Sequence, residues 1–357
     1  MKQPTMIVCL SKVNGGMELA SLKLARLLST EVPVHFLAKE NSFIHEQSPN
    51  YLDPCSVTFH AIDFDRFFSL KLILQTRKIL QDNQIRNIIF LGASEMRSLY
   101  FATLGLNINF IIRQGSKKTT PKKDWFHRLI YSNVSGFVGN CEFMRQNIAE
   151  ILPIPPKASL QRIYASLKLP STVHPKPING TIDIVQTGRI HPGKGQFDAI
   201  KACQILHDHN IAFTLKFLGD FQHQTYYAEM TEFLQNCPYR SQVEFIGYTP
   251  EVPKYLENSD IFIFPSLGEG MSNAIIESLG YGLIPIIYDD TSSPEFLDLG
   301  FHLHLTQSNS VESLQKALLF TAVNIAEEKT KALNNIPLAQ RVFNPNREKE
   351  EYLALLH

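Results

Sequence analysis

The sequence predicts an α/β protein with two Rossmann-like domains, each built on a parallel sheet, and three observations carry this prediction. Short, continuous apolar runs recur along the chain, stretches of helical periodicity lie between them, and one proline-rich segment divides the runs into two series. Strands that are buried on both faces are apolar throughout rather than alternating, and such strands separated by helices form parallel sheets. A chain of 357 residues is long enough for two ordinary domains.

The apolar runs give the expected strands. The first series is Met6–Leu10, Val34–Leu37, Ile88–Leu91, Phe110–Ile112 and Phe137–Val138, and the second is Ile182–Val185, Leu215–Leu218, Val243–Ile246, Ile261–Phe264 and Ile284–Tyr288. In open α/β sheets ligands bind at the carboxyl ends of the strands. The residues that follow each run are therefore the first place to look for chemistry.

The segment LPSTVHPKPING, residues 169–180, separates the two series. It holds three prolines and a glycine and has neither a helical nor a strand period, which is typical of a linker. We expect an N-terminal domain over residues 1–170, a linker over 171–180 and a C-terminal domain over 181–335. In the tail, NPNREKEEYLALLH, an asparagine start signal precedes a helical pattern. We expect residues 336–357 to form a C-terminal helix that packs back towards the N-terminal domain.

Charge and cysteine content narrow the class of protein. The 34 basic and 34 acidic residues give a formal net charge of zero, which argues against nucleic acid as a partner, because nucleic-acid binders carry excess positive charge. The five cysteines are far apart and form no C-x-x-C pair, which suits a reducing compartment. No apolar stretch reaches the roughly 18 residues of a membrane span. We therefore expect a cytoplasmic protein.

The segment IFIFPSLGEGMSNAIIESLGYGLIPII, residues 261–287, holds the most informative pattern. An expected strand leads into a Pro-Ser-Leu-Gly turn, then Glu269, and then a helix from about Met271. Seven residues separate Glu269 from Glu277, so the two carboxylates would line one cleft at different depths. Free backbone N–H groups at the helix start would form a docking site for an anion or a hydroxyl. They belong to Gly270, Met271, Ser272 and Asn273.

A basic turn, TGRIHPGKG, follows the first strand of the second series. It spans residues 187–195 and contains glycine and proline, so Arg189 and Lys194 can converge on one diphosphate. A second turn, Asn14-Gly15-Gly16, follows the first strand of the chain and leads into a helix. Glycine lets the backbone approach a phosphate or a sugar closely. The turn is not G-x-G-x-x-G, which disfavours dinucleotide binding, and Gly16 is the expected contact.

These segments together resemble the retaining family 4 glycosyltransferases, and the similarity is to bacterial lipopolysaccharide and cell-envelope enzymes. Glu269 and Glu277 match their E-x7-E motif, and residues 187–195 match their diphosphate clamp. The resemblance is strong over residues 181–300 and looser over residues 1–170. It implies the GT-B fold, in which two Rossmann-like domains face each other across a cleft and the N-terminal domain lies on the acceptor side.

The resemblance also implies the roles of individual residues. Glu277 would hold the ribose of the nucleotide and Glu269 the hydroxyls of the donor sugar. Arg189 and Lys194, with the amides at the helix start, would stabilise the leaving diphosphate. Tyr248, in the segment VEFIGY, would lie near the base. The expected reaction is transfer of a sugar, with retention, from a nucleoside diphosphate sugar such as a UDP-sugar to a glycan or glycolipid acceptor in lipopolysaccharide core or other envelope polysaccharide synthesis.

One departure from the family concerns Arg113, which stands where many relatives carry a histidine near the donor sugar. Its permanently charged guanidinium suits the donor sugar, the diphosphate or an anionic acceptor. Arg113 opens a basic stretch, RQGSKKTTPKKDWFHR, that ends at Arg128 and includes the only tryptophan, Trp125. A basic cluster beside aromatic residues can lie on an anionic leaflet or bind the phosphates of a lipid-linked acceptor. We expect possible peripheral attachment to the inner face of the cytoplasmic membrane, while a mobile charged loop is the alternative.

The sequence indicates no catalytic metal and no cofactor, since the nucleoside diphosphate sugar would be a co-substrate. Asp63-Phe64-Asp65 imitates a metal-binding D-x-D motif, but it precedes a helical stretch and is interpreted as helix N-terminal carboxylates. Two other functions stay open. One is a sugar-nucleotide epimerase on the same fold, which would consume the donor without an acceptor. The other is a non-catalytic subunit that binds a sugar nucleotide.

Overall fold

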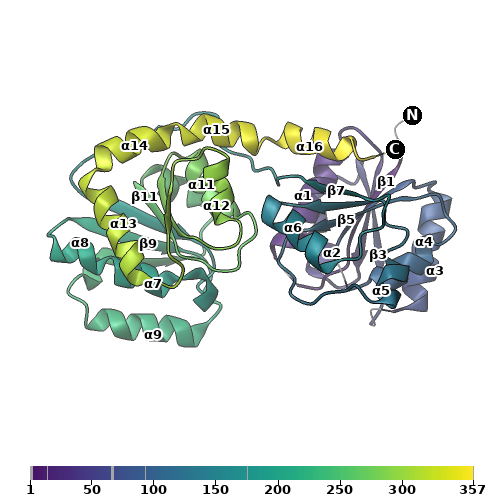
Figure 1. The fold of residues 1–357 in the computed structure, drawn as a ribbon, viewed down its shortest axis with the longest axis horizontal. Helices are drawn as coiled ribbons and strands as arrows, with labels where there is room; N and C mark the ends of the chain where they lie inside the picture. Colours follow the sequence, from purple (N-terminus) through teal and green to yellow (C-terminus); the bar gives the residue numbers. More distant parts are fainter. Residues whose placement is uncertain (1–2, 14, 66–67, 93, 175, 357) are drawn as a thin grey trace. The chain divides into compact units, whose positions relative to one another are not determined.

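The computed structural model describes residues 3–13, 15–65, 68–92, 94–174 and 176–356. The chain divides into two compact units. Unit 1 comprises Met1–Ala165 together with Pro345–His357, and unit 2 comprises Ser166–Asn344. Each unit is a parallel sheet with helices on its faces, which confirms the predicted fold class of two Rossmann-like α/β domains (Figure 1).

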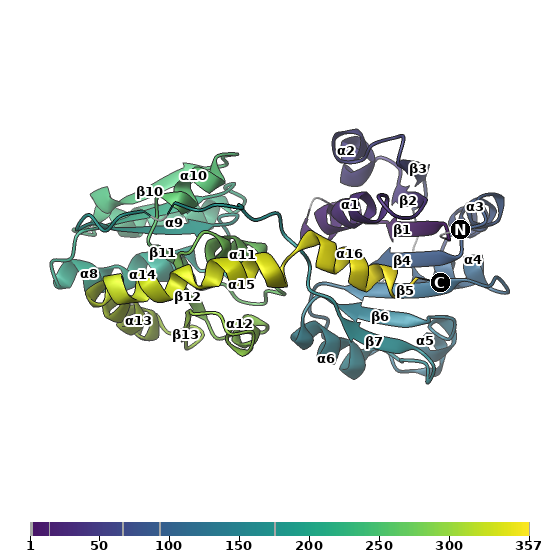
Figure 2. The ribbon, with the colours of Figure 1, turned by 90° about the horizontal axis from the view of Figure 1, so that it is seen from above.

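Unit 1 contains a seven-stranded parallel sheet in the order β3-β2-β1-β4-β5-β6-β7, which Figure 2 shows from above. The strands are β1 Thr5–Cys9, β2 Val34–Lys39, β3 Val57–Ile62, β4 Asn87–Leu91, β5 Asn109–Gln114, β6 Gly136–Gly139 and β7 Ser159–Arg162. The helices are α1 Gly16–Leu28, α2 Phe43–Tyr51, α3 Leu70–Asp82, α4 Met96–Thr103, α5 Trp125–Ile130, α6 Glu142–Ile151 and α16 Pro345–Leu353. Because all strands are parallel, their carboxyl ends lie at one edge of the sheet.

The central strands of unit 1 are apolar throughout because both faces of the sheet are covered. In β1, Met6 and Val8 belong to one hydrophobic cluster, whereas Ile7 and Cys9 belong to the cluster on the opposite face. Successive side chains of a strand point to opposite faces, so an unbroken apolar run serves both layers. This is the physical basis of the short runs in the sequence.

Unit 2 contains a six-stranded parallel sheet in the order β10-β9-β8-β11-β12-β13. The strands are β8 Ile182–Thr187, β9 Phe213–Leu218, β10 Val243–Gly247, β11 Ile261–Phe264, β12 Ile284–Tyr288 and β13 His304–Thr306. The α-helices are α7 Gln196–Ala202, α8 Gln204–Asp208, α9 Gln224–Gln235, α10 Val252–Glu257, α11 Asn273–Gly280, α12 Ser293–Asp298, α13 Val311–Val323, α14 Ile325–Leu333 and α15 Asn335–Val342. Short 3-10 helices occupy Pro192–Lys194 (η1) and Arg240–Gln242 (η2).

Three strands, β3, β7 and β13, were not among the predicted apolar runs, and each lies at an edge of its sheet. β3 and β7 are partly exposed, and β13 is only three residues long. These three edge strands keep polar residues among their apolar ones and so give no continuous apolar signal, whereas the fourth edge strand, β10, coincides with the predicted run Val243–Ile246.

The observed division of the chain differs from the expected one at residues 166–180. Residues before and within the expected linker pack on unit 2: Leu169 lies against Gly280, and the Lys176 ammonium lies 2.7 Å from the Asp260 carboxylate. The unit boundary therefore falls at Ala165, not at residue 170. Prolines mark where regular structure stops, whereas packing decides to which unit an irregular segment belongs.

The C-terminal segment also divides differently from the expected single helix over 336–357. Helix α15 belongs to unit 2 and helix α16, which begins at Pro345, belongs to unit 1. Proline disfavours a helical conformation in the residue before it, so one helix ends before Pro345 and another begins there. Tyr352 of α16 is fully buried in unit 1, and the Glu348 carboxylate lies 3.0 Å from the Lys23 ammonium of α1.

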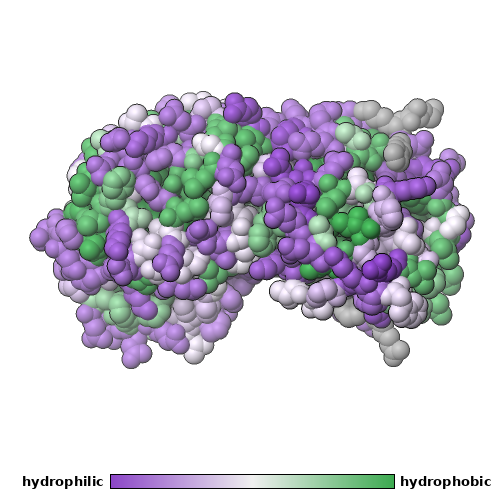
Figure 3. Space-filling model, viewed as in Figure 1, coloured by the Kyte–Doolittle hydropathy of each residue, from purple (hydrophilic) through white to green (hydrophobic). Residues whose placement is uncertain are grey.

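The surface in Figure 3 is mainly hydrophilic, with hydrophobic side chains in small separate patches. Within the described residues, none of the helices has the length and apolar character that crossing a membrane requires. The apolar side chains instead form the cores between sheets and helices.

Candidate functional site

In unit 2 the loop after β8 and the loop after β11 pack directly against each other. Gly195 has a left-handed backbone (φ 70°), and a Cβ at this position would lie 2.0 Å from the Pro265 carbonyl oxygen. Only glycine allows this approach. The Gly193 carbonyl also accepts hydrogen bonds from the Leu267 amide (3.0 Å) and the Ser266 hydroxyl (3.0 Å). The two predicted motifs, residues 187–195 and 261–287, thus form one structure.

This packing brings Lys194 and Glu269 together. The Lys194 ammonium forms an ion pair with Glu269 Oε1, and the Ser266 hydroxyl lies 2.8 Å from the same oxygen. The side chains of Lys194 and Glu269 are 21% and 25% exposed, so both remain accessible to a ligand. An ammonium has three donors and a carboxylate has two acceptor oxygens. The pair can therefore bind a phosphate and a hydroxyl without first separating.

A third loop, after β12, supports Glu269 from the other side. The Asp290 carboxylate accepts a hydrogen bond from the Gly268 amide at 2.5 Å. The Thr291 hydroxyl donates to the Glu269 carbonyl, and the Ser292 hydroxyl donates to the Gly270 carbonyl at 2.8 Å. Sequence reasoning missed Ser266 and these three residues. Their signal was position, because they directly follow neighbouring parallel strands whose ends share one sheet edge.

Arg189 is the other cation of the predicted diphosphate clamp. It follows Gly188, whose φ of 141° suits glycine, and its guanidinium donates to the Gln222 side chain at 3.1 Å. The Arg189 side chain is exposed. The structure places both cations on the loop after β8, with Arg189 hydrogen-bonded to Gln222 and Lys194 paired with Glu269.

Helix α11 begins later than expected, at Asn273, with Ser272 as its N-cap. Gly270, Met271 and Ser272 precede the helix, because the bonds from the β12 loop hold residues 268–270 in a turn. The Ser272 side chain makes no capping hydrogen bond, so the amides of the first helical turn lack the usual side-chain cap. A helix start of this kind attracts negative charge.

Glu277 lies in the second turn of α11. Burial raises the pKa of Glu277 from its ordinary value to about 7. No described residue forms a hydrogen bond or an ion pair with its carboxylate, in contrast to Glu269. Glu277 is partly buried, and a partly buried carboxylate without a partner is costly in a free protein and is typical of a functional position. Tyr248, which follows β10, is 76% exposed.

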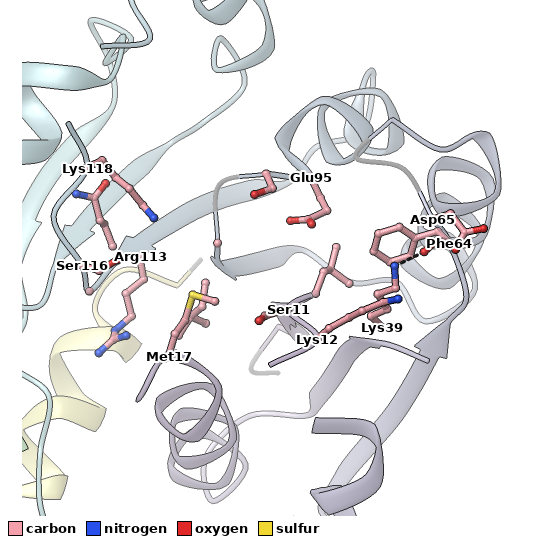
Figure 4. Close-up of a pocket in the computed structure, with 16 residues that line it drawn as sticks. Ser11, Lys12, Met17, Lys39, Phe64, Asp65, Glu95, Arg113, Ser116 and Lys118 are labelled. Atoms are coloured by element: carbon pink, nitrogen blue, oxygen red, sulfur yellow. Dashed lines mark hydrogen bonds between the residues drawn. The ribbon is translucent and has the colours of Figure 1, made fainter. Parts of the chain in front are cut away.

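In unit 1, Arg113 is the penultimate residue of β5 and is 6% exposed. It lines a cavity of about 470 Å³ at the carboxyl ends of the strands, shown in Figure 4. Burial raises the pKa of Tyr352 on α16, although the neighbouring Arg113 guanidinium acts in the opposite direction. Arg113 therefore lies between the cavity and the C-terminal helix.

Gly16 is the first residue of α1, and a Cβ there would meet no atom within 4 Å. The space beside Gly16 is thus open to a ligand. Asn14 lies outside the described residues. Because the two units are described separately, the structure does not place Gly16 or Arg113 relative to Glu269.

The interpretation of Asp63 and Asp65 as helix N-terminal carboxylates needs correction. The N-cap of α3 is Ser69, whose hydroxyl accepts a hydrogen bond from the Leu72 amide at 3.3 Å. Asp63 lies 3.7 Å from Lys71 in the first turn of that helix, and Asp65 instead lines the unit 1 cavity.

Within the described chain, one group of side chains has the spacing to hold a metal ion: His302, His304 and Glu328. The two imidazoles lie 2.8 Å and 2.7 Å from the same Glu328 oxygen, and Lys331 lies 3.0 Å from the other oxygen. Burial raises and these partners lower the pKa of Glu328, with a net shift to about 2. This hydrogen-bonded network is complete without a metal and joins β13 to α14, and it shares no residue with the Lys194–Glu269 site.

Comparisons with known proteins find similarity to glycosyltransferases. Residues 174–331 match the family "Glycosyl transferases group 1". The chain is 25% identical over 276 residues to the amylovoran biosynthesis glycosyltransferase AmsK of Erwinia amylovora, covering 74% of this chain and 61% of AmsK. It is 21% identical over 328 residues to the capsular polysaccharide biosynthesis glycosyltransferase CapH of Staphylococcus aureus, covering 86% of this chain and 89% of CapH.

The fold has solved counterparts as well. The structure of HepE from Anabaena in complex with UDP superposes with a TM-score of 0.77 at 14% identity, covering 99% of this chain and 98% of HepE. The aligned region spans about three fifths of AmsK but most of CapH. Residues 174–331 therefore match the glycosyl transferases group 1 family, the chain has the GT-B fold of solved structures such as HepE, and it is similar to relatives named for bacterial polysaccharide synthesis.

Proposed function

We propose that this chain is a retaining glycosyltransferase that moves a sugar from a nucleoside diphosphate sugar to a glycan or glycolipid acceptor of the bacterial envelope. The observation that carries the proposal is the Lys194–Glu269 pair beside the uncapped start of α11, with the unpartnered Glu277 in the same helix. The ammonium and the helix start suit a diphosphate, and the two carboxylates suit the hydroxyls of a sugar and of a ribose.

Each group has a proposed task. Arg189, Lys194 and the α11 amides, among them Asn273, would stabilise the diphosphate as it gains negative charge on leaving. Glu269 would accept hydrogen bonds from the donor sugar and Glu277 from the ribose, with Tyr248 beside the base. From unit 1, Gly16 would approach the donor and Arg113 the donor or the acceptor. No residue is proposed as a covalent nucleophile, and no metal is proposed.

The donor is proposed to be a UDP-sugar, which the complex of HepE with UDP supports. The acceptor is proposed to be a glycan of lipopolysaccharide core or another envelope polysaccharide, which the names of AmsK and CapH support. These relatives share less than a third of their residues with this chain, so the choice of base, sugar and acceptor is part of the proposal.

A cytoplasmic location at the membrane surface forms part of the same proposal. Trp125 at the start of α5 is 76% exposed and Leu129 is 45% exposed, and Lys123 and Arg128 flank them. Exposed aromatic and basic side chains of this kind bind anionic leaflets. Sedimentation with vesicles that contain anionic lipid should capture the chain, and Trp125→Ala should reduce capture. Equal capture by neutral vesicles would contradict the proposal.

The decisive experiment is thermal unfolding of the full chain with UDP, GDP, ADP and CMP, each at millimolar concentration. A nucleotide that binds only the folded state at 100 times its Kd stabilises it by about 2.7 kcal/mol. We expect one nucleoside diphosphate to raise the Tm, and Glu277→Ala to abolish the shift. No shift with any of the four would remove the donor-site assignment.

With the donor identified, proton NMR of donor turnover tests the reaction. A retaining transferase releases the sugar, to acceptor or slowly to water, with the anomeric configuration of the donor. Inversion would contradict the proposed mechanism. Conversion of the donor to another nucleotide sugar without acceptor would instead show an epimerase.

A further inference from the structure

The cavity of unit 1 lies at the carboxyl ends of five neighbouring strands. Residues at or just after the ends of β3, β2, β1, β4 and β5 line it, and α1 contributes Met17. Its volume of about 470 Å³ is in the range of small-molecule sites. Figure 4 shows Lys12 and Lys39 beside Phe64 on one side and Arg113 and Lys118 on the other.

Lys39, the last residue of β2, is a buried cation in this cavity. It is 6% exposed, donates to the Phe64 carbonyl and lies 4.1 Å from the centroid of the Phe64 ring. Both partners are uncharged, and no carboxylate of the described chain lies within ion-pair distance of Lys39. Lysine is almost never buried without a counter-charge, because desolvating an ammonium is costly. Arg113, also 6% exposed, likewise forms no ion pair with a described residue.

The cavity lining carries more positive than negative charge. Four cations, Lys12, Lys39, Arg113 and Lys118, face two carboxylates, Asp65 and Glu95. Burial raises the pKa of Glu95, while the charge of Lys39 acts on it in the opposite direction without an ion pair between the two. A neighbouring cavity of about 240 Å³ shares the Lys118 lining and adds further lysines, Lys117 and Lys122.

The basic loop after β5 is anchored to helix α6. The Asn147 side chain, 5% exposed, accepts from the Lys118 amide at 2.9 Å and donates to the Lys118 carbonyl at 2.9 Å. The Lys122 amide donates to the Ile151 carbonyl at 2.7 Å. Lys118 is therefore held at the rim of the cavity by its backbone, while its side chain remains exposed.

We propose that this cavity binds an oxyanion carried by the acceptor, either a phosphate group or a sugar carboxylate, with Lys39 as the buried counter-charge and Lys118 and Lys12 at the rim. Hydroxyls of Ser11 and Ser116 in the same lining supply hydrogen bonds for the sugar that carries the anion. The inference rests on the proposed function, since it assigns this site to the acceptor. It narrows the acceptor to a charged glycan.

The test measures binding of inorganic pyrophosphate, glucuronate and glucose to the full chain by thermal unfolding. The chain carries Lys194→Ala in every arm, which weakens the phosphate site of unit 2, and the variants of unit 1 described below identify the remaining anion binding. We expect pyrophosphate or glucuronate, but not glucose, to raise the Tm. Which anion is effective distinguishes the phosphate source from the carboxylate source.

Variants locate the site. Lys39→Met, which preserves the length of the buried side chain, and Lys118→Ala, at an exposed position, should each weaken anion binding by about tenfold or more. Lys78→Ala removes an exposed lysine of α3 outside the cavity and should change nothing. Anion stabilisation that survives both cavity variants, or that is equal for glucose, would overturn the proposal.

The outcome is separable from that of the nucleotide experiment. Nucleotide binding depends on Glu277 in unit 2, whereas anion binding in the Lys194→Ala background depends on Lys39 in unit 1. Failure of the first with success of the second would leave an oxyanion site without a donor site. Failure of the second alone would leave the transferase with a neutral acceptor.

Discussion

The two units differ in the sign of the charged groups that they leave without an ionic partner. In unit 2, Lys194 is already paired with Glu269, and the group left without a partner is a carboxylate, Glu277. In unit 1, two buried cations, Lys39 and Arg113, form no ion pair with a described residue. An unpaired carboxylate suits hydroxyl donors, whereas unpaired cations suit an anion. We therefore expect the two units to bind different parts of the substrates: hydroxyl groups in unit 2 and an anion in unit 1.

The difference follows from how each site is assembled. The unit 2 site is formed by two short loops whose backbones are in contact at Gly195 and Pro265. This contact brings Lys194 of one loop next to Glu269 of the other. The unit 1 cavity is made by strand ends far apart in the chain, with Tyr352 of the returning α16 beside Arg113. In unit 2 the contact between loops brings the two members of an ion pair together. In unit 1 the cations at the strand ends have no such partner among the described residues, and a bound anion would neutralise them.

The largest effect expected from this contrast is on the chemistry of unit 2. Lys194→Ala removes the cation closest to Glu269 and should lower donor turnover about 100-fold, the usual loss for one donor that stabilises charge in the transition state. Steady-state rates with the identified donor measure it. Lys254→Ala, which removes an exposed lysine of α10, is the matched control. A loss shared by both variants would mean that only overall charge matters.

A stability measurement tests whether the Lys194–Glu269 ion pair of unit 2 depends on the backbone contact between Gly195 and Pro265. Gly195→Ala forces a left-handed residue and a Cβ into the Pro265 carbonyl, and should destabilise unit 2 by roughly 2–4 kcal/mol. Gly193→Ala, two residues earlier, meets only ordinary contacts, the nearest 3.5 Å from His191, and should change stability by about 0.5 kcal/mol or less. Urea unfolding of both variants gives the comparison. Equal stabilities would show that the loops rearrange freely.

The smallest effect concerns the pH dependence that Glu277 confers. Its pKa in the folded chain, about 7, lies above the ordinary value of 4.5, so the folded state binds the extra proton. Its contribution to stability is thus favourable at low pH and is lost as the pH rises from 4.5 through 7. A ribose hydroxyl needs the ionised carboxylate as acceptor, so nucleotide binding should strengthen several-fold between pH 6 and pH 8.

Glu277→Gln provides the control for this pH dependence. The neutral amide should bind the nucleotide more weakly and with no change between pH 6 and pH 8. At pH 8 it should also raise the Tm of the free chain, because no charge remains to be buried. Titration calorimetry at the two pH values measures the first, and thermal unfolding the second. A wild-type affinity that falls with rising pH would contradict the proposed role.

Much of the fold was predictable because the central strands are buried on both faces. Runs such as Ile261–Phe264 and Ile284–Tyr288 coincide with β11 and β12. The edge strands β3, β7 and β13 escaped because one-sided pairing leaves them mixed in polarity. The unit boundary escaped because packing of residues such as Leu169, not proline content, decided it.

Within the site, the sequence pattern pointed to Glu269, Glu277, Arg189 and Lys194, since each lies in a loop after a predicted strand or in the first two turns of the helix that follows. Spacing gave no signal for Ser266 or Asp290 as supports of Glu269, because hydrogen bonds between loops of different strands depend on the order of strands in the sheet. Spacing also gave no signal for Lys39, because in the sequence this residue is indistinguishable from the end of an ordinary strand.

The sequence by itself determined the two α/β units, the interior strands and the turn glycines, because burial on two faces and left-handed backbone leave local traces in residue type. Only the tertiary structure decided which charges are paired. Lys194 meets Glu269 through the Gly195–Pro265 contact, and Lys39 is buried among uncharged partners. Whether two charges form an ion pair depends on the distance between them in space. The distance between strand ends is set by the order of the strands in the sheet, not by their order in the chain.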